Sequence, residues 1–449
     1  MQADSLTQTL KEAIKKRDKE TLLSLFEHNH PVDIVDAVSS FSLAHITKLF
    51  SLIPLEEQVQ IYEYADKGLQ IILASTIEKK SFTKIFISMH SDEQADLYDI
   101  LPNTLKEELL KQLSEEQKSI LHQLVSYKES EVGSIMTTDF ILLHATMSAN
   151  DALLAIKKLA KYSEIISEAY VLNNQRELVG KVLLKDILIA NQKKVLSEIM
   201  HDSPASLNVH DEKEKAARLI AKYDAFSIPV VDDENKILGI VTHDDALDVA
   251  NDTASEDFLK LSATHPSGLL EGIKNATIKT LYQKRVVWLL ILVFGNIFSG
   301  AGIAHFEETI AAYISLLFFL PLLIGSAGNA GSQSATLTVR ALATGEVILQ
   351  DWRRMILKEL GVATLLGLTM GVAVSFLGIF RGGVEIALVV ALTMQAVVIV
   401  GSLIGLLLPF LLTKLRLDPA TASAPLVTSI ADATGVVIYF SIASALLPI

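Results

Sequence analysis

The sequence predicts a multidomain membrane protein with an all-helical, superhelical N-terminal domain, a tandem pair of α/β units, an amphipathic connecting helix and a five-span helical transmembrane domain. Three observations lead to this prediction. Half of the 449 residues are hydrophobic and the mean hydropathy is +0.38, yet 20% are charged. The charged and apolar stretches are segregated along the chain, and an internal repeat lies within the charged part. This combination is typical of a soluble region joined to a membrane region.

The net charge is divided unequally between the two halves. From Lys284 onward there are nine Lys and Arg and eight Asp and Glu, a net of +1, so the total of −13 leaves −14 on residues 1–283. An acidic soluble half argues against nucleic acid as a partner and for cations. The absence of cysteine excludes a disulfide framework and a thiolate metal site. The first twenty residues have no apolar core, so they are not expected to be a signal peptide.

Residues 1–131 are expected to form the helical N-terminal domain. Short amphipathic patterns are separated by polar turns and by proline, as at Pro54 and Pro102, with almost no β-branched alternation. In the segment SDEQADLYD, Asp92, Asp96 and Asp99 recur on one helix face. A solvated face and a cation-binding face both remain open for these acids.

An internal repeat predicts two α/β units over residues 132–196 and 197–252. The segment AYVLNNQRELVGKVLLKDIL matches SIPVVDDENKILGIVTHDDAL at a constant offset of 59, which pairs Gly180 with Gly239. Each copy has the pattern of a β-α-β-β-α unit and is preceded by a similar entry, Ser-Ile-Met in the first copy and Glu-Ile-Met in the second.

The end of the second copy is strongly acidic, with the sequence THDDALDVANDTASED. On a helix four of its acids fall within an arc of about 80°, because each residue advances about 100°. These acids are Asp245, Asp248, Asp252 and Glu256. Such like charges repel unless they are solvated or neutralised by divalent cations against a second acidic surface, which SDEQADLYD could provide. Oxygen ligands without cysteine, and eleven scattered histidines, favour Mg²⁺, Ca²⁺ or Mn²⁺ over Zn²⁺ or Cu²⁺.

Residues 253–283 form the predicted connecting helix, interrupted at residues 265–268, and residues 284–449 form the transmembrane domain. The five expected spans are 286–306, 310–339, 360–380, 384–412 and 422–449. Lys and Arg cluster before the first span and in the second and fourth connections, whereas the opposite side carries only Arg381. The positive-inside rule then predicts a cytoplasmic N-terminal half and an external C-terminus.

The second span is unusually polar after residue 325, with the sequence SAGNAGSQSATLTVRALATGE. Small residues allow close helix packing, but packing does not account for Asn329 and Gln333, whose amides need partners in an apolar medium. Pro321 is expected to break the helix just upstream.

The last span contains a single ionised side chain, Asp432. Twenty-eight residues of helix reach about 42 Å, so this carboxylate is expected near the middle of a hydrocarbon core of about 30 Å. A carboxylate there costs at least roughly 2.5–3.5 kcal/mol, so it is normally kept where it faces an ion, a pathway or a partner charge. A protonated Asp432 tied into helix packing is the alternative.

The segments PLLIGSAGNAGSQSATLTVRALATGE and LRLDPATASAPLVTSIADATGVVIYF resemble the two signature segments of the MgtE family of magnesium channels. The tandem repeat resembles a pair of CBS domains, which that family also contains, with a helical N-domain, a plug helix and five transmembrane helices. The resemblance implies a homodimer in the lipid bilayer of the cell membrane, with a pore between the protomers and magnesium at acidic cytoplasmic interfaces that hold it shut.

The resemblance also implies roles for individual residues. Asp432 matches the pore carboxylate and Asn329 lies in the matching second-span segment, while Thr253 stands where an acid is expected in the sensor helix. The positions that correspond to regulatory magnesium ligands are Asp92, Asp96, Glu214, Asp224, Asp245, Asp248, Glu256 and Asp257.

CBS pairs often bind adenine nucleotides, and a hydroxyl three residues before the repeated aspartate helps to hold the ribose. The second copy has Thr242 before Asp245, but the first has Leu183 before Asp186. If ATP binds, it is therefore expected at Thr242 and Asp245. A CBS pair with a purely structural role is favoured over one that binds a nucleotide.

Functions other than selective magnesium uptake are also compatible with a carboxylate within a membrane span. An intramembrane aspartyl protease needs two carboxylates that share a proton, whereas Asp432 stands alone in its span. No enzymatic activity is expected. A proton-coupled carrier and a less selective Mn²⁺ or Co²⁺ transporter stay open, because oxygen ligands separate these ions poorly. A membrane-anchored Mg²⁺ or nucleotide sensor is the alternative without transport.

Overall fold

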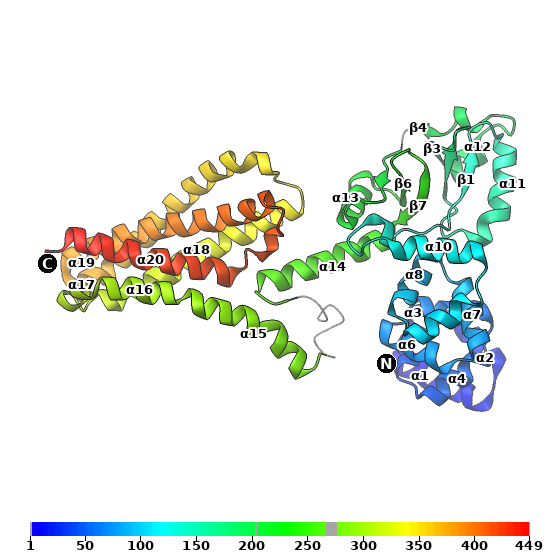
Figure 1. The fold of residues 1–449 in the computed structure, drawn as a ribbon, viewed down its shortest axis with the longest axis horizontal. Coiled ribbons are helices and arrows are strands. Elements are labelled where there is room, and N and C mark those ends of the chain that lie inside the picture. Colours follow the sequence, from blue (N-terminus) through cyan, green and yellow to red (C-terminus); the bar gives the residue numbers. More distant parts are fainter. Residues whose placement is uncertain (1, 203, 266–275, 449) are drawn as a thin grey trace. The chain divides into compact units, whose positions relative to one another are not determined.

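The chain divides into two compact units, Met1–Ala250 and Asn251–Ile449, and each is described by itself. The structure is a computed structural model that describes residues 2–202, 204–265 and 276–448 (Figure 1). The first unit contains the helical N-terminal part and the two α/β units. The second contains the membrane helices.

The N-terminal part consists of short helices whose starts follow the turn signals of the sequence. Pro54 and Pro102 occupy the N-cap positions of α5 and α9, and Ser114 forms a capping box with Gln117 at the start of α10. The helices are α1 (Gln2–Lys16), α2 (Lys19–His28), α3 (Pro31–Ser39), α4 (Leu43–Phe50), α5 (Leu55–Glu63), α6 (Lys67–Thr76), α7 (Lys79–Ser88), α8 (Ser91–Ile100), α9 (Asn103–Leu110) and α10 (Glu115–Ser126). The expected all-helical domain is therefore confirmed.

The repeat forms two sheets with matching pairing. In the first, β1 (Leu142–His144) runs parallel to β2 (Glu168–Leu172), which pairs antiparallel with β3 (Leu178–Leu183). In the second, β5 (Leu207–Asn208), β6 (Ser227–Val231) and β7 (Ile237–Thr242) repeat this arrangement. Val171 pairs with Gly180 in the first sheet and Val230 with Gly239 in the second, so the register repeats at the offset seen in the sequence. The remaining elements are α11 (Ala149–Leu159), α12 (Leu184–Ile189), β4 (His201–Asp202) and α13 (Lys213–Tyr223).

The entry segments tie the two copies into one body. Thr137, which follows the first entry, forms a bridge with Ile240 of the second copy. Strand β4, which follows the second entry, pairs with β3 of the first copy. A Cβ on Gly239 would lie 2.8 Å from the Thr137 carbonyl oxygen and 2.9 Å from the Met136 sulfur. Each entry segment therefore pairs with the sheet of the other copy. A side chain at position 239 would collide with the first entry segment, so this contact requires Gly239.

Helix α14 (His243–Leu261) continues directly from the second copy. The expected boundary between residues 252 and 253 lies inside this helix. Most of the expected interruption at residues 265–268 lies outside the described residues.

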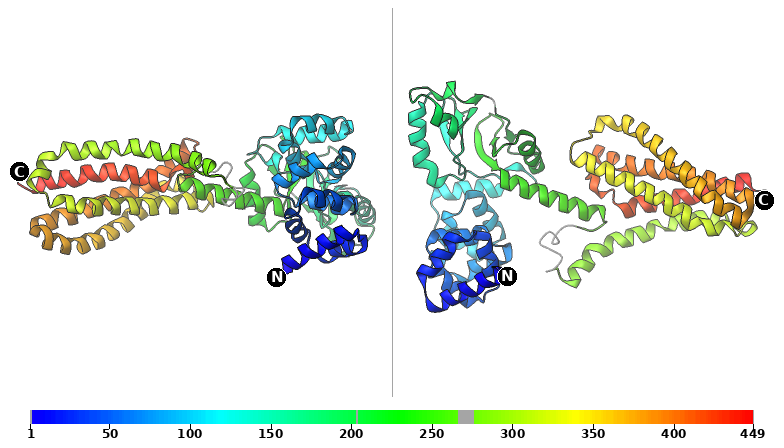
Figure 2. Two further views of the ribbon diagram at one scale, coloured as in Figure 1. Left: turned by 90° about the horizontal axis from the view of Figure 1, so that it is seen from below. Right: turned by 180° about the vertical axis from the view of Figure 1, so that it is seen from behind.

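The second unit is built from helices. They are α15 (Ile278–Gly295), α16 (Ile297–His305), α17 (Glu307–Ala312), α18 (Leu316–Ala343), α19 (Trp352–Lys414) and α20 (Ala424–Leu446). The long helices α18, α19 and α20 lie side by side in both views of Figure 2. Three helical stretches of the described chain are long and apolar enough to cross a membrane, namely Ile278–His305, Leu349–Lys414 and Ala424–Leu446.

Helix α19 is two antiparallel arms joined at Gly383, which has φ +83° and ψ −179°. A Cβ on Gly378 would lie 2.5 Å from the Ala387 Cα, and one on Gly371 would lie 3.1 Å from the Ala391 carbonyl oxygen. The arms therefore fold back on each other and provide two spans. The positive φ is a conformation that glycine adopts at little steric cost.

Helix α18 covers most of the remaining expected span, 310–339, and its small and polar residues interrupt the apolar run. It begins at Leu316 rather than at residue 310, and residues 307–312 form the separate helix α17. The expectation that Pro321 breaks the helix is wrong, because α18 continues through it. Pro321 lies in the second turn, where it removes a single backbone hydrogen bond from the helix.

Glycines of α19 bring its backbone against that of α18. A Cβ on Gly405 would lie 2.0 Å from the Gly331 carbonyl oxygen, and one on Gly401 would lie 2.4 Å from that of Ala327. Because these neighbours are backbone atoms, a side chain at either position has to push the helices apart.

We expect Gly405→Ala to destabilise the protein by about 1–3 kcal/mol, the usual cost of overpacking. Gly361 on the same helix is the matched control, because no described atom lies within 4 Å of its added Cβ. Gly361→Ala should leave the thermal midpoint of the full-length protein in detergent unchanged or slightly higher, since alanine favours helix. Equal midpoints for Gly405→Ala and the parent would show that the two helices are not in direct backbone contact.

Candidate metal site

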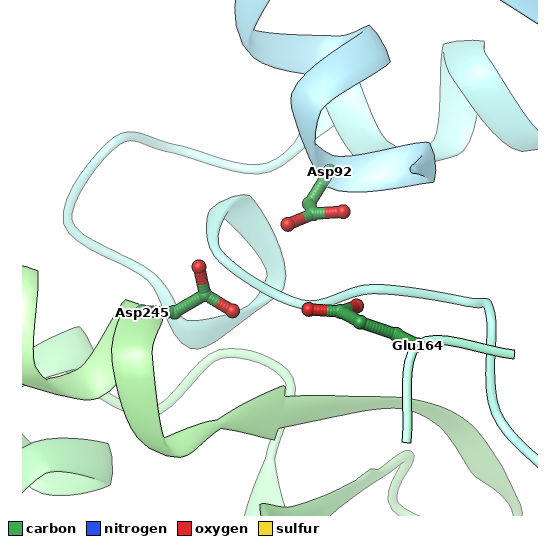
Figure 3. A group of neighbouring side chains, drawn as sticks. All are labelled: Asp92, Glu164 and Asp245. Carbon is green, nitrogen blue, oxygen red and sulfur yellow. The ribbon is translucent and has the colours of Figure 1, made fainter. Parts of the chain in front are cut away.

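Three carboxylates from separate parts of the first unit point toward a common space. Asp92, Glu164 and Asp245 each offer a carboxylate oxygen, and these oxygens all lie within 4.8 Å of one another (Figure 3). Asp92 belongs to α8, Asp245 to the first turn of α14, and Glu164 to the segment before β2. The three residues are called the acidic triad below.

The residues that carry the triad are fixed by hydrogen bonds to the segment at residues 137–139. The Ser91 backbone N–H donates to Asp139 Oδ2 at 2.8 Å, and the Thr138 N–H donates to Ser91 Oγ at 2.7 Å. The Glu164 N–H donates to the Asp139 carbonyl oxygen at 2.8 Å. One short segment therefore positions both the start of α8 and the segment that bears Glu164.

Asp245 is positioned by the strand that precedes it. Thr242, the last residue of β7, is 1% exposed and its hydroxyl donates to Asp245 Oδ2 at 2.5 Å. This contact involves the pair expected to hold a nucleotide in the second copy. The Thr242 hydroxyl is therefore already used to orient an acid of the triad.

Burial raises the pKa of each triad carboxyl, and the neighbouring acids raise it further. The pKa of Asp92 rises to about 7, through burial and then the charge of Asp245. The pKa of Glu164 rises to about 8, through burial and then the charge of Asp92. Burial raises the pKa of Asp245 to about 6, although the Thr242 hydroxyl opposes the rise. The three groups therefore resist simultaneous ionisation in the absence of a cation.

Other charged groups surround the triad. Burial and the charge of Asp92 raise the pKa of Glu93 to about 8. His90 is the neighbouring base, and the nearby Asp139 carboxylate raises its pKa to about 9. The Nδ1 atom of His90 lies 3.7 Å from Asp139 Oδ2. His90 therefore carries a positive charge next to an otherwise acidic cluster.

The triad fits a divalent cation that prefers oxygen ligands. Asp92 Oδ1 and Glu164 Oε2 are buried and have no hydrogen-bond partner among the described residues. Such atoms are costly unless a cation or water satisfies them. Mg²⁺, Ca²⁺ and Mn²⁺ accept carboxylate oxygens and can complete their shells with water.

The other expected regulatory residues lie apart from the triad. Asp96 lies one turn along α8, where burial raises its pKa. Glu214 lies in the first turn of α13, whereas Asp224 caps its far end. Eleven residues of helix span about 16 Å, so these two cannot share one ion within a chain.

The acids that follow Asp245 lie along α14. Asp248 lies one turn later and its charge contributes to the raised pKa of Asp245. Glu256 forms an ion pair with Lys260, with 2.6 Å between Oε1 and Nζ. Asp252 and Asp257 belong to the same helix.

Glu164 was missed by the sequence analysis. It lies between the 3₁₀ turn Ala160–Tyr162 and strand β2, in the non-periodic segment SEIISE. No local spacing distinguishes it, because only the tertiary fold brings it to Asp92 and Asp245.

In the second unit, Asp432 lies within α20 and is partly buried. Its Oδ1 atom is buried without a hydrogen-bond partner among the described residues. One turn earlier, Thr428 packs against α18, where a Cβ on Gly328 would lie 2.8 Å from its Cγ2. The Ser332 and Thr428 hydroxyls lie 3.2 Å apart. Asp432 therefore lies beside the contact between α18 and α20.

Helix α18 leaves a polar face exposed on a single chain. Asn329, Gln333, Thr336 and Arg340 recur at three- and four-residue spacing and are exposed. In a lipid bilayer, such a face requires water or a second protein surface. Asn329 lies next to Gly328, which packs on α20 near Asp432.

Comparisons with known proteins agree with this organisation. The model of the MgtE divalent cation transporter family matches residues 320–442, that of the MgtE intracellular N domain matches 29–130, and that of the CBS domain matches 132–193 and 196–252. A magnesium transporter MgtE of Thermus thermophilus is 33% identical over 99% of both chains. Another, of Bacillus subtilis, is 28% identical over 94% of this chain and 93% of its own.

Two solved structures resemble the first unit. The soluble part of a magnesium transporter aligns with a TM-score of 0.54 and 25% identity, over 56% of this chain and 99% of that one. The cytosolic domain of the Mg²⁺ channel MgtE in complex with ATP aligns with a TM-score of 0.51 and 26% identity, over 54% of this chain and 99% of that one.

Without divalent cations, stability should fall as the pH rises from about 5 to 8. The folded-state pKa values of the triad, about 6 to 8, exceed the ordinary values of 3.8 and 4.5, so the folded state binds more protons over this interval. Calorimetry of the full-length protein should show a falling unfolding midpoint that Mg²⁺ restores. The variant Asp92→Asn/Glu164→Gln/Asp245→Asn should lose the triad's share of this pH dependence, whereas Glu93 and His90 keep their own contributions. The same pH dependence in both proteins would contradict the assignment.

Proposed function

The chain belongs to the MgtE family of divalent cation transporters, and on that premise we propose that it is a Mg²⁺-selective channel for magnesium uptake, closed by negative feedback from cytoplasmic Mg²⁺. The family is one of transporters, not of enzymes. The proposed location is the cell membrane, with the acidic N-terminal domains in the cytoplasm.

The observation that carries this proposal is the isolated carboxylate of Asp432 in α20. Its Oδ1 atom is buried without a partner among the described residues. Mg²⁺ sheds water reluctantly and is usually held by one or two carboxylates with several waters retained. One Asp432 from each of two chains, related by a two-fold axis, would provide such a site.

The proposed homodimer accounts for the exposed polar face of α18. Asn329 and Gln333 would then face a watery path or a second chain instead of lipid. In this arrangement Asn329 assists permeation through its amide oxygen, and Asp432 supplies the charge that compensates for lost hydration.

The proposed closing signal is Mg²⁺ bound at the acidic triad. Without a cation, Asp92, Glu164 and Asp245 repel one another, and burial makes their ionisation costly. A bound divalent cation would favour the conformation in which the three segments are together. Shifting a gate from 1:99 to 99:1 requires about 5.5 kcal/mol of differential binding, which several such sites can supply together.

The remaining acids are proposed to form further regulatory sites. Glu214 and Asp224 lie at opposite ends of α13, so we assign them to different ions. Asp96, Asp248, Glu256 and Asp257 are proposed as ligands at the surfaces of α8 and α14.

We propose the CBS pair as the place where ATP could bind. A related cytosolic domain is in complex with ATP. Because the Thr242 hydroxyl donates to Asp245, a ribose held at Thr242 would compete with the triad for that hydroxyl. Nucleotide binding and cation binding are therefore proposed to be coupled, and calorimetric titration with ATP at several Mg²⁺ concentrations measures the coupling.

We expect Asp432→Ala and Asp432→Asn to lower Mg²⁺ flux into proteoliposomes by at least about tenfold, a loss of about 1.4 kcal/mol in the barrier for permeation. Charge, and not only an oxygen ligand, is needed to compensate for lost hydration. Glu346→Gln, which neutralises an exposed acid outside the spans, is the matched control.

Flux of Mn²⁺ and Co²⁺ in the same proteoliposomes separates the alternatives. Equal flux of the three cations through the parent protein would favour a less selective transporter. Flux through neither parent nor variant would favour a sensor without transport, and parental Mg²⁺ flux through Asp432→Asn would rule out the pore assignment.

A further inference from the structure

Lys260, in the last turn of α14, lies between two carboxylates of the second unit. Its Nζ atom lies 2.6 Å from Glu256 Oε1, one turn earlier, and 2.5 Å from Asp418 Oδ2, which follows α19. The side chains of Lys260 and Asp418 are only 23% and 36% exposed. Partial burial reduces screening by water and salt, so this pair is stronger than a typical surface pair.

The side chains around Lys260 favour its charged form. Burial lowers the pKa of Lys260, but hydrogen bonds to Asp418 and Glu256 outweigh this effect, and the pKa is raised overall. The ammonium group therefore acts as a cation fixed between two acids. Glu256, one of the positions proposed to bind a regulatory magnesium ion, uses its Oε1 atom in this ion pair, so Lys260 also lies next to a proposed cation ligand.

Asp418 is also a structural part of the corner that leads into α20. Its Oδ1 atom accepts a hydrogen bond from the Ala420 N–H at 2.8 Å and caps the 3₁₀ turn Pro419–Thr421. Ser423 is fully buried, caps α20, and accepts a hydrogen bond from Trp288 Nε1 at 3.3 Å. The Ser423 N–H donates to the Thr421 carbonyl oxygen at 2.7 Å, so the turn that Asp418 caps is hydrogen-bonded to the residue that caps α20.

Helix α20 connects this corner to the membrane carboxylate. Asp432 lies eight residues beyond Ala424, about 12 Å along the helix. The helix that carries Lys260 begins at His243, so Asp245 of the triad and Lys260 belong to one uninterrupted helix. The two ends of α14 thus carry an acid of the candidate metal site and the contact with the corner before α20.

We propose that Lys260 is a positioning residue that couples α14 to α20 through Asp418, so that a change in α14 reaches the helix of Asp432 directly. This inference rests on the proposed function, because the signal it transmits is the closing signal. The Lys260–Asp418 ion pair provides a route that does not depend on residues 266–275.

A double-mutant cycle tests the coupling in the full-length channel. Lys260→Met removes the charge and keeps an unbranched side chain, whereas Asp418→Asn keeps an oxygen that can accept from the Ala420 N–H. Each single variant should raise the cytoplasmic Mg²⁺ concentration for half-closure by about threefold or more, with unchanged single-channel conductance. The double variant should show no further shift, and Lys260→Arg should resemble the parent. Lys279→Met, at an exposed position on α15, is the matched control.

Two results would overturn the proposal: an unchanged closing curve for Lys260→Met, or shifts that simply add in the double variant. Hydrogen exchange provides a readout that does not depend on transport. Backbone amides at residues 420–427 should exchange faster in Lys260→Met than in the parent or in Lys279→Met. Equal exchange in all three would also overturn the coupling, whereas faster exchange in a protein that does not close with Mg²⁺ would support the coupling and contradict the proposed function.

Discussion

The mutual repulsion of Asp92, Glu164 and Asp245 is the constraint on which the first unit depends. Packing holds their carboxylate oxygens within 4.8 Å of one another, and burial makes their ionisation costly. The three residues come from the helical N-terminal part, from the first α/β copy and from the helix that follows the second. A cation that neutralises them therefore stabilises the contact among all three parts at once, which makes this site suited to sensing.

In the membrane unit, close backbone packing positions the polar residues. Gly401 and Gly405 bring α19 against α18, and Gly328 brings α18 against Thr428 of α20. These contacts leave the polar face that bears Asn329 exposed on one chain. Lipid cannot provide hydrogen-bond partners for the polar side chains of this face. The proposed pore therefore requires a second chain.

The sequence predicted those features that depend on local spacing. The offset of 59 predicted both α/β copies, and the acidic faces of α8 and α14 supplied Asp92 and Asp245, which the fold brings together. Glu164 could not be found, because its segment has no periodicity. Pro321 was misjudged because one missing hydrogen bond does not end a helix whose other bonds continue. The pairing of Lys260 with Asp418 joins positions 158 residues apart, which no local pattern reveals.

In the proposed mechanism, a cation at the acidic triad closes the pore. The most direct test is single-channel open probability as a function of cytoplasmic Mg²⁺ for the parent, for Asp92→Asn/Glu164→Gln/Asp245→Asn and for the control Glu107→Gln, an exposed acid on α9. The triple variant should keep its conductance but stay open at millimolar Mg²⁺, where the parent and the control close. A triple variant that closes along the same curve as the parent would rule out closure by a cation at the triad.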